Sequence, residues 1–224
     1  SDDNSAPYQL ARLHKIYREQ KVYMSNNSQI ARVAYEFDFP VIWALFQMEK
    51  RGMKLDDTLL KQMGDELAAE VGELEQQMYS MAGYEFNASS PAQLSEVLFT
   101  KLQLPTAGIK KGKTGYSTGQ KELDKLRGQH PIIELIERYR ELTKLISTYI
   151  EALPKLMATD GRIHTTFNQD VTSTGRLSST NPNLQNIPVR TELGRKIRQA
   201  FVPSDGKVFV GADYSVSKSS VSRA

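Results

Sequence analysis

The feature that most constrains the fold is a long apolar seam between residues 57 and 82. Large apolar side chains recur there every three or four residues, at Leu60, Met63, Leu67, Val71, Leu74, Met78 and Met81. This spacing predicts one amphipathic helix from Asp57 to Ala82, ended by Gly83. At about 1.5 Å per residue, that helix would be roughly 39 Å long. Such a seam is typical of a core or of a helix-pair contact, and we assign it no chemistry.

Further helices are expected on both sides of this rod. Apolar residues at helical spacing start at Leu10, and the apolar segment 39–52 ends at Gly52, a natural helix stop. Ser90 followed by Pro91 is typical of the start of a short helix. Another long helix is predicted from His130 to about Pro154. Between these last two lies a basic, glycine-rich loop, residues 106–118.

The pattern changes at Gly161. Residues 162–169 alternate and are rich in β-branched and aromatic side chains, which favours a strand. Segments 196–203 and 207–213 flank an Asp-Gly turn, and we predict that they form a hairpin. The expected fold class is therefore α+β, with a helical first part followed by the start of an antiparallel sheet.

Charge is distributed unevenly along the 224 residues. Residues 1–100 carry 9 Lys and Arg against 15 Asp and Glu. Residues 101–149 carry 10 against 5, and residues 155–201 carry 7 against 3. This asymmetry suggests a polyanionic partner for the later part of the chain, although uneven surface charge is also common in proteins without such a partner.

Composition excludes several classes of function. The chain has no cysteine, which excludes disulfides, thiolate catalysis and cysteine-type zinc sites. The same absence is compatible with a reducing cytoplasm, the location that we expect. No stretch approaches the ~20 apolar residues that a membrane span requires. The acidic, polar start does not have the pattern of a signal peptide.

Three ordered motifs lie between Thr174 and Ser215. They are TGRLSS from Thr174, PNLQNIP from Pro182 and ADYS from Ala212. Together they resemble the palm-entry segment and the motif A strand of family A DNA polymerases, the family of bacterial DNA polymerase I. Shorter matches upstream support the resemblance, which runs from about Phe39 to Ser215. They are Phe86-Asn87, Ser90-Pro91, Gln93-Leu94, Leu98-Phe99, Ser117-Thr118, Tyr139-Arg140, Lys144-Leu145 and Ser147-Thr148-Tyr149.

The resemblance implies an organisation in three parts. Residues 1–38 are similar, more weakly, to the tail of an exonuclease-like domain. Residues 39–160 would form the thumb and its connecting helices, with the long helix pair and the basic loop gripping duplex. Residues 161–224 would form the N-terminal part of the palm, with an atypical end at 216–224.

A polymerase must hold DNA of any sequence, so it has to bind the phosphate backbone and the base edges that do not vary. Every base pair presents an acceptor in the minor groove, purine N3 or pyrimidine O2. The resemblance implies that Arg176 contacts the minor groove at the primer terminus and has a catalytic role. Gln185 and Asn186 would lie along the duplex beside it, with Thr172 and Asn183 near the backbone. The thumb positions that match duplex-backbone contacts are Asn87, Ser90, Arg140, Lys144, Ser147 and Thr148.

Each of these residues also has a simpler interpretation. The segment PNLQNIP alone is a loop with proline limits and turn-capping amides. Arg176 alone would be a surface ion-pairing residue. Arg140 and Lys144, four residues apart, could be a solvated helix face. Only the ordered combination of these motifs favours a DNA-binding function.

Asp213 follows the apolar run from Val208 to Ala212, where a buried strand would deliver a carboxylate to a sheet edge. The alternative is an aspartate that ends a strand and starts a turn. Phosphoryl transfer to a primer hydroxyl requires divalent metals, and Mg²⁺ prefers carboxylate oxygens. The resemblance implies that Asp213 is one of two metal-bridging, catalytic aspartates in a two-Mg²⁺ site, and that the backbone carbonyl of Tyr214 is a further ligand.

The resemblance stops after Ser215. The family continues with Gln-Ile-Glu-Leu-Arg, whereas this chain has Val-Ser-Lys-Ser-Ser from Val216. The fingers helix, which binds deoxynucleoside triphosphates in the intact enzyme, and the segment with the second metal aspartate do not follow. One carboxylate cannot clamp two metals, so we expect this chain alone not to polymerise DNA.

Palm strands without neighbours would expose a sheet edge, through which the chain could self-associate. Two other functions stay open. The chain could be a DNA-binding module without catalysis, or a helical interaction protein without a nucleic-acid partner.

Overall fold

The computed structural model describes residues 5–113 and 115–212, and the chain divides into two compact units. The first unit combines the residues up to Gly52 with His164–Asn186. The second combines Met53–Ile163 with the residues from Ile187 onward. No helix within the described ranges is long and apolar enough to cross a membrane.

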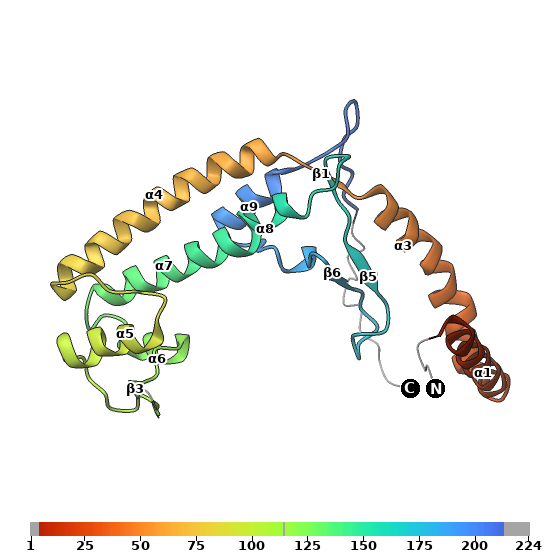
Figure 1. Ribbon diagram of the computed structural model, residues 1–224, viewed down its shortest axis with the longest axis horizontal. Helices are drawn as coiled ribbons and strands as arrows, with labels where there is room; N and C mark the ends of the chain where they lie inside the picture. Colours follow the sequence, from red (N-terminus) through yellow and green to blue (C-terminus); the bar gives the residue numbers. More distant parts are fainter. Residues whose placement is uncertain (1–4, 114, 213–224) are drawn as a thin grey trace, which may run out of the picture. The chain divides into compact units, whose positions relative to one another are not determined.

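A pair of long helices forms the body of the second unit. α4 (Asp57–Ala82) and α7 (Ile132–Leu145) lie side by side and run in opposite directions (Figure 1). α7 continues into a π-helical turn, η3 (Ile146–Ile150), and then into α8 (Ala152–Lys155). The prediction of one helix over residues 57–82 is confirmed.

Both ends of α4 have clear local causes. The carboxylate of Asp56 accepts a hydrogen bond from the Leu59 N–H at 3.0 Å, which caps the first turn. At the other end Gly83 adopts a left-handed conformation, with φ 81°, and its N–H donates to the Tyr79 carbonyl at 2.7 Å. Glycine takes this conformation without steric cost, so the helix ends there.

The core of the second unit lies between these two helices. α4 buries most of its predicted seam, although Val71 and Met81 are only partly covered. Arg138 of α7 joins the pair at the surface by donating from Nε to Glu70 of α4 at 2.7 Å. The buried residues of the pair are Leu60, Met63, Leu67, Leu74, Met78 and Ala82 on α4, and Ile132, Ile133, Ile136, Tyr139, Leu142 and Leu145 on α7.

The segment between α4 and α7, residues 83–131, is called the tip here. It contains α5 (Pro91–Ser95), a π-helical turn η2 (Glu96–Lys101) and α6 (Gln120–Leu126). The predicted basic loop contains two short paired strands, β2 (Lys111–Gly112) and β3 (Gly115–Tyr116). Ser90 caps α5 as predicted, since its hydroxyl accepts from the Gln93 N–H at 3.4 Å.

A three-stranded antiparallel sheet lies in the second unit, in the order β4-β1-β7. The central strand β1 (Met53–Leu55) pairs with β4 (Arg162–Ile163) on one side and with β7 (Phe201–Val202) on the other. In register, Lys54 lies opposite Arg162 and Val202. The expected antiparallel sheet is therefore present and the α+β class is confirmed.

The prediction of a hairpin over residues 196–213 is wrong. Residues of its first arm belong to a helix, α9 (Glu192–Gln199), and β7 pairs with β1 instead of with residues 207–212. Two causes favour the helix. The Thr191 hydroxyl accepts from the Gly194 N–H at 3.1 Å, and Leu193 and Ile197, four residues apart, are both buried.

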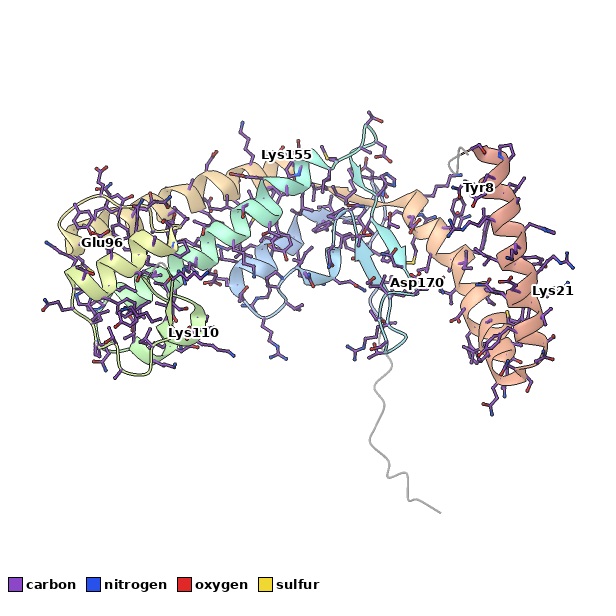
Figure 2. All side chains as sticks on the ribbon, turned by 60° about the horizontal axis from the view of Figure 1, so that its bottom comes forward. Tyr8, Lys21, Glu96, Lys110, Lys155 and Asp170 are labelled. Atoms are coloured by element: carbon purple, nitrogen blue, oxygen red, sulfur yellow. The ribbon has the colours of Figure 1, made fainter. Side chains whose placement is uncertain are left out.

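The first unit begins with helices whose side chains are mostly exposed, as Figure 2 shows for α1 with Tyr8 and Lys21 labelled. These elements are α1 (Ala6–Ser25), α2 (Ser28–Val33), a π-helical turn η1 (Ala34–Asp38) and α3 (Phe39–Arg51). Gly52 ends α3 as predicted.

A two-stranded hairpin completes the first unit. β5 (Thr166–Asn168) pairs with β6 (Ser178–Thr180), and a short 3-10 turn, η4 (Leu184–Asn186), follows. The single strand predicted over residues 162–169 is thus interrupted. Its first residues form β4 and its last ones form β5. Between them, His164 Nδ1 lies 2.7 Å from the Glu49 carbonyl, and the Thr165 hydroxyl contacts the carbonyls of Thr180 and Pro182.

Candidate nucleic-acid interface

Residues 169–186 carry five of the predicted DNA-binding residues, and they are called the primer-end segment here after the role that the sequence resemblance implies. The segment leaves β5 next to Asp170, which Figure 2 labels, and returns along β6. Arg176 is exposed near the end of the loop. The Thr172 hydroxyl donates to the Arg176 carbonyl, so these two predicted residues are brought together. The bond closes a turn from Thr172 to Arg176, and Arg176 is exposed to solvent at the end of this turn.

Amide side chains fix the second half of this segment. Asn183 Oδ1 accepts from the Gln185 N–H at 3.0 Å and from the buried Ser179 hydroxyl at 3.3 Å. Gln185 Nε2 donates to the Leu177 carbonyl at 3.1 Å. Asn186 is exposed beside it. The simpler interpretation, turn capping, therefore describes what Asn183 does within the described part of the chain.

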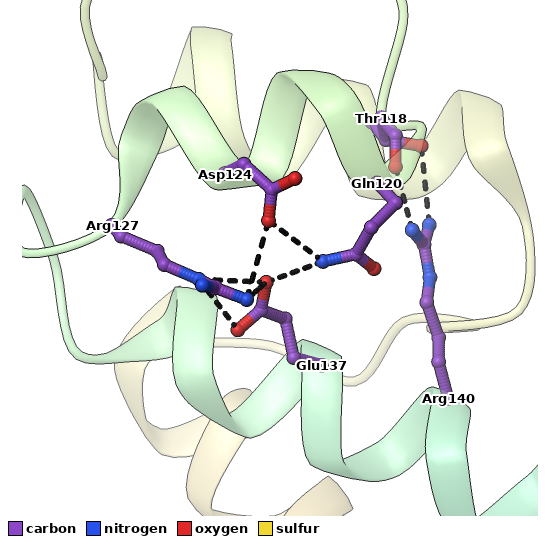
Figure 3. A network of polar contacts seen from close by, with 6 residues as sticks. All are labelled: Thr118, Gln120, Asp124, Arg127, Glu137 and Arg140. Carbon is purple, nitrogen blue, oxygen red and sulfur yellow. Dashed lines mark hydrogen bonds and ion pairs between the residues drawn. The ribbon is translucent and has the colours of Figure 1, made fainter. Parts of the chain in front are cut away.

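Arg140 contacts the tip rather than extending into solvent. Its guanidinium donates to the backbone carbonyl of Thr118 at 2.6 Å and to the Thr118 hydroxyl at 3.3 Å (Figure 3). Burial lowers the pKa of Arg140 from its ordinary value, because the charged form loses hydration. Arg140 therefore joins α7 to the start of α6. Thr118, only 4% exposed, was given no role from sequence. Its burial and its contact with Arg140 are visible only in the structure.

A second set of polar contacts holds α6 against α7 (Figure 3). Arg127 Nη2 lies 2.9 Å from Glu137 Oε1 and 3.2 Å from Asp124 Oδ1. Gln120 Nε2 donates to the same Glu137 oxygen at 2.6 Å. Hydrogen bonding to Glu137 raises the pKa of Arg127. These contacts stabilise the shape of the tip.

The remaining predicted residues of the second unit fall into two classes. Asn87 and Ser90 already cap local turns, since Asn87 Oδ1 accepts from the Ser89 N–H at 2.9 Å and Ser90 caps α5. Lys144, Ser147 and Thr148 are exposed along α7 and η3. The Ser147 hydroxyl donates to the Lys144 carbonyl at 3.2 Å. An exposed lysine followed by two exposed hydroxyls is a set of donors suited to phosphate oxygens.

An open pocket of about 410 Å³ lies where the tip meets Arg140. Its cationic members are Lys110 and Arg140, and its wall includes Tyr116 and Thr118. Lys111 stands over the Tyr116 ring, with 5.2 Å between its nitrogen and the ring centroid. The pocket thus combines positive charge, a hydroxyl and glycine backbone, which are suited to an anion.

No group of three His, Asp or Glu side chains that could hold a metal is found within residues 5–113 and 115–212. The predicted ligands Asp213 and Tyr214 lie outside the described residues. The fit of a magnesium ion therefore depends on residues outside the described ranges.

Comparison with known proteins decides the family. The model of DNA polymerase family A matches residues 57–217, which is more than half of the chain. The chain belongs to DNA polymerase family A. The resemblance carried by the TGRLSS, PNLQNIP and ADYS motifs is confirmed.

Relatives of this family A chain are similar over most of its length. It is 53% identical to DNA polymerase I of Bacillus caldotenax over 187 residues, 82% of the chain. It is 48% identical to DNA polymerase I of Bacillus subtilis over 200 residues, 88% of the chain. The chain spans about a fifth of the length of these relatives, 21% and 22%.

A solved structure is also similar. The POL domain of Pol1 from M. smegmatis, in complex with DNA primer-template and dNTP, matches with a TM-score of 0.72 and 41% identity. The match covers 83% of this chain and 33% of that one.

Proposed function

We propose that this chain is the part of a DNA-directed DNA polymerase that grips the primer-template duplex. In this proposal α4, α7 and the tip act as the thumb, residues from 161 onward begin the palm, and residues 1–38 end an exonuclease-like domain. The observation that carries the proposal is the family match over residues 57–217, which includes the motif positions. The similarity to a polymerase domain that was solved with primer-template supports it.

The backbone grip is assigned to exposed cations and hydroxyls of the second unit. Lys144, Ser147 and Thr148 are the exposed members on α7 and η3. At the tip, Asn87 and Ser90 would contribute from turns that they already cap. Phosphate contacts of this kind hold duplex of any sequence, and each neutralised phosphate releases condensed counterions.

The minor-groove contacts are assigned to the primer-end segment. Arg176 supplies an exposed, permanently charged donor, and Gln185 and Asn186 supply amide donors. A donor in the minor groove meets purine N3 or pyrimidine O2 whatever the sequence, so such contacts test the geometry of the terminal pair. Thr172 and Asn183 would lie near the backbone while they hold the loop in shape.

Nucleotide transfer is proposed for the intact enzyme, which would bind deoxynucleoside triphosphates and two Mg²⁺ ions. When bound, the metals would lower the pKa of the primer hydroxyl and neutralise the leaving pyrophosphate. Asp213 and Tyr214 are the proposed ligands in this chain. A single carboxylate does not complete a two-metal site, so we propose that the chain alone does not extend primers. Its lack of cysteine is compatible with the cytoplasmic location that we also propose.

Primer-template binding measured across a salt series tests the grip. If the chain neutralises three or more phosphates, the logarithm of the association constant should fall against the logarithm of salt with a slope of about −3 or steeper. Weak binding that does not change with salt would refute the proposal and would favour a helical interaction protein. Primer extension by the purified chain, with an Asp213→Ala preparation as the contamination control, would refute the proposed inactivity.

A further inference from the structure

The end of α3 and the start of β5 are joined twice through one residue, Glu49. The Glu49 carboxylate accepts a hydrogen bond from the backbone N–H of Phe167 at 2.6 Å. The backbone carbonyl of Glu49 lies 2.7 Å from Nδ1 of His164. A carbonyl oxygen only accepts, so this ring nitrogen carries the hydrogen. Both contacts lie within the first unit.

The exposure pattern of α3 shows which of its faces meets the hairpin. Of its thirteen residues, Leu45 is buried and Glu49 is partly buried, whereas the others are exposed. These two residues are four apart and therefore lie on the same face. A carboxylate on a covered face loses hydration, and the short bond from Phe167 offsets this cost. The Glu49 carboxylate therefore serves as a hydrogen-bond acceptor for Phe167 rather than as a solvated surface charge.

Phe167 needs such an acceptor because of the topology of its sheet. Among the described residues β5 pairs with β6 alone, so within that part of the chain the other side of β5 is an edge with unpaired backbone groups. The N–H of Phe167 points to this edge, and the Glu49 carboxylate satisfies it. Immediately before α3, the Asp38 carbonyl accepts from Gln169 Nε2 at 3.1 Å, just after the other end of β5.

The primer-end segment begins at the end of β5. Glu49 therefore acts on it through the strand: it holds β5, β5 sets the register of β6 through three residue pairs, and the loop between them presents Thr172 and Arg176. Glu49 itself contacts neither of these two residues in the hydrogen bonds of the described part.

We propose that Glu49 is a positioning residue, which fixes the β5–β6 hairpin so that the primer-end segment has one geometry before DNA binds. This inference rests on the proposed function only for what the segment binds. The hairpin's dependence on Glu49 is a property of the free chain and is measured separately.

The test uses the whole chain and two substitutions at the same position. Glu49→Ala removes the acceptor of Phe167, while Glu49→Gln keeps an oxygen in its place. Hydrogen exchange should speed up roughly tenfold in peptides covering β5 and β6 of Glu49→Ala, since a charge-assisted bond is lost. Glu49→Gln should restore most of the protection. Exchange in α4 and α7 should not change, which shows that the variant is folded.

Primer-template binding of the same variants gives the second measurement. Glu49→Ala should weaken binding roughly threefold to tenfold with an unchanged salt slope, because no phosphate contact is removed. Arg176→Gln should weaken binding without changing exchange in β6. Glu73→Ala, which removes an exposed glutamate of α4, is the matched control and should change neither quantity.

Two outcomes would overturn the inference. One is wild-type exchange of β5 and β6 in Glu49→Ala, and the other is failure of Glu49→Gln to restore protection. If the wild-type chain does not bind primer-template, the proposed function fails, and the exchange comparison still decides whether Glu49 positions the hairpin.

Discussion

Replacing Arg140 by alanine should destabilise the second unit before any DNA is present. The change removes two hydrogen bonds to Thr118, one of 2.6 Å to its carbonyl and one of 3.3 Å to its hydroxyl. Thr118 is only 4% exposed in the intact protein, so both bonds are shielded from bulk solvent. Hydrogen bonds from charged donors contribute about 1.5–3 kcal/mol each, and the longer bond contributes little. Burial of the guanidinium, which lowers its pKa, offsets part of this gain.

The expected loss is therefore about 2 kcal/mol in the free energy of unfolding, measured by urea titration of the helical circular dichroism. Lys144→Ala is the matched control, because Lys144 is an exposed cation one turn further along α7. It should change stability by less than about 0.5 kcal/mol. Arg140→Ala with an unchanged urea midpoint would show that the contact with Thr118 does not support the tip.

Three further changes test a glycine of α9, a glycine of α4 and an ion pair of the second unit. Gly194→Ala should cost about 1–3 kcal/mol, because a Cβ there would overlap the carbonyl oxygen of Pro188. Gly72→Ala on α4 meets open space and should instead stabilise by roughly 0.5–1 kcal/mol in the same urea titration. The hydrogen bond from Lys54 lowers the pKa of Asp205, so their 2.7 Å pair stabilises the fold at neutral pH and is lost as the pH falls below the ordinary value of 3.8. Asp205→Asn should accordingly lower the urea midpoint at pH 7 and leave it unchanged near pH 2, and equal midpoints at pH 7 would contradict this.

The long helices were predictable from sequence because local signals agree there. The seam of α4, the cap at Asp56 and the left-handed Gly83 all favour the same bounds. The prediction of a strand over residues 196–203 was wrong because the β-branched and aromatic residues there favour a strand locally, whereas residues 196–199 belong to α9. The capping hydroxyl of Thr191 and the buried pair Leu193 and Ile197 lie partly outside that window. Tertiary burial there overrides the local preference.

The candidate site was predictable only as a set of residues. Family motifs identified Arg176, Gln185 and Asn186, and the structure adds that Gln185 is held by the Leu177 carbonyl. The contact between Arg140 and Thr118 spans 22 residues, and sequence spacing gives no information on it. Glu49 was missed for the same reason, since its partners lie more than 110 residues away.

The central claim is that donors of the primer-end segment face minor-groove acceptors at the primer end. The most direct test measures binding of the wild-type chain and of Arg176→Ala to two primer-templates. One carries guanine at the primer terminus and the other carries 3-deazaguanine, which lacks the N3 acceptor. The wild-type chain should lose roughly tenfold in affinity for the altered primer, as expected for one hydrogen bond from a charged donor, and Arg176→Ala, which has no side-chain donor, should lose nothing further. Equal losses in both proteins, or none in the wild type, would contradict the claim.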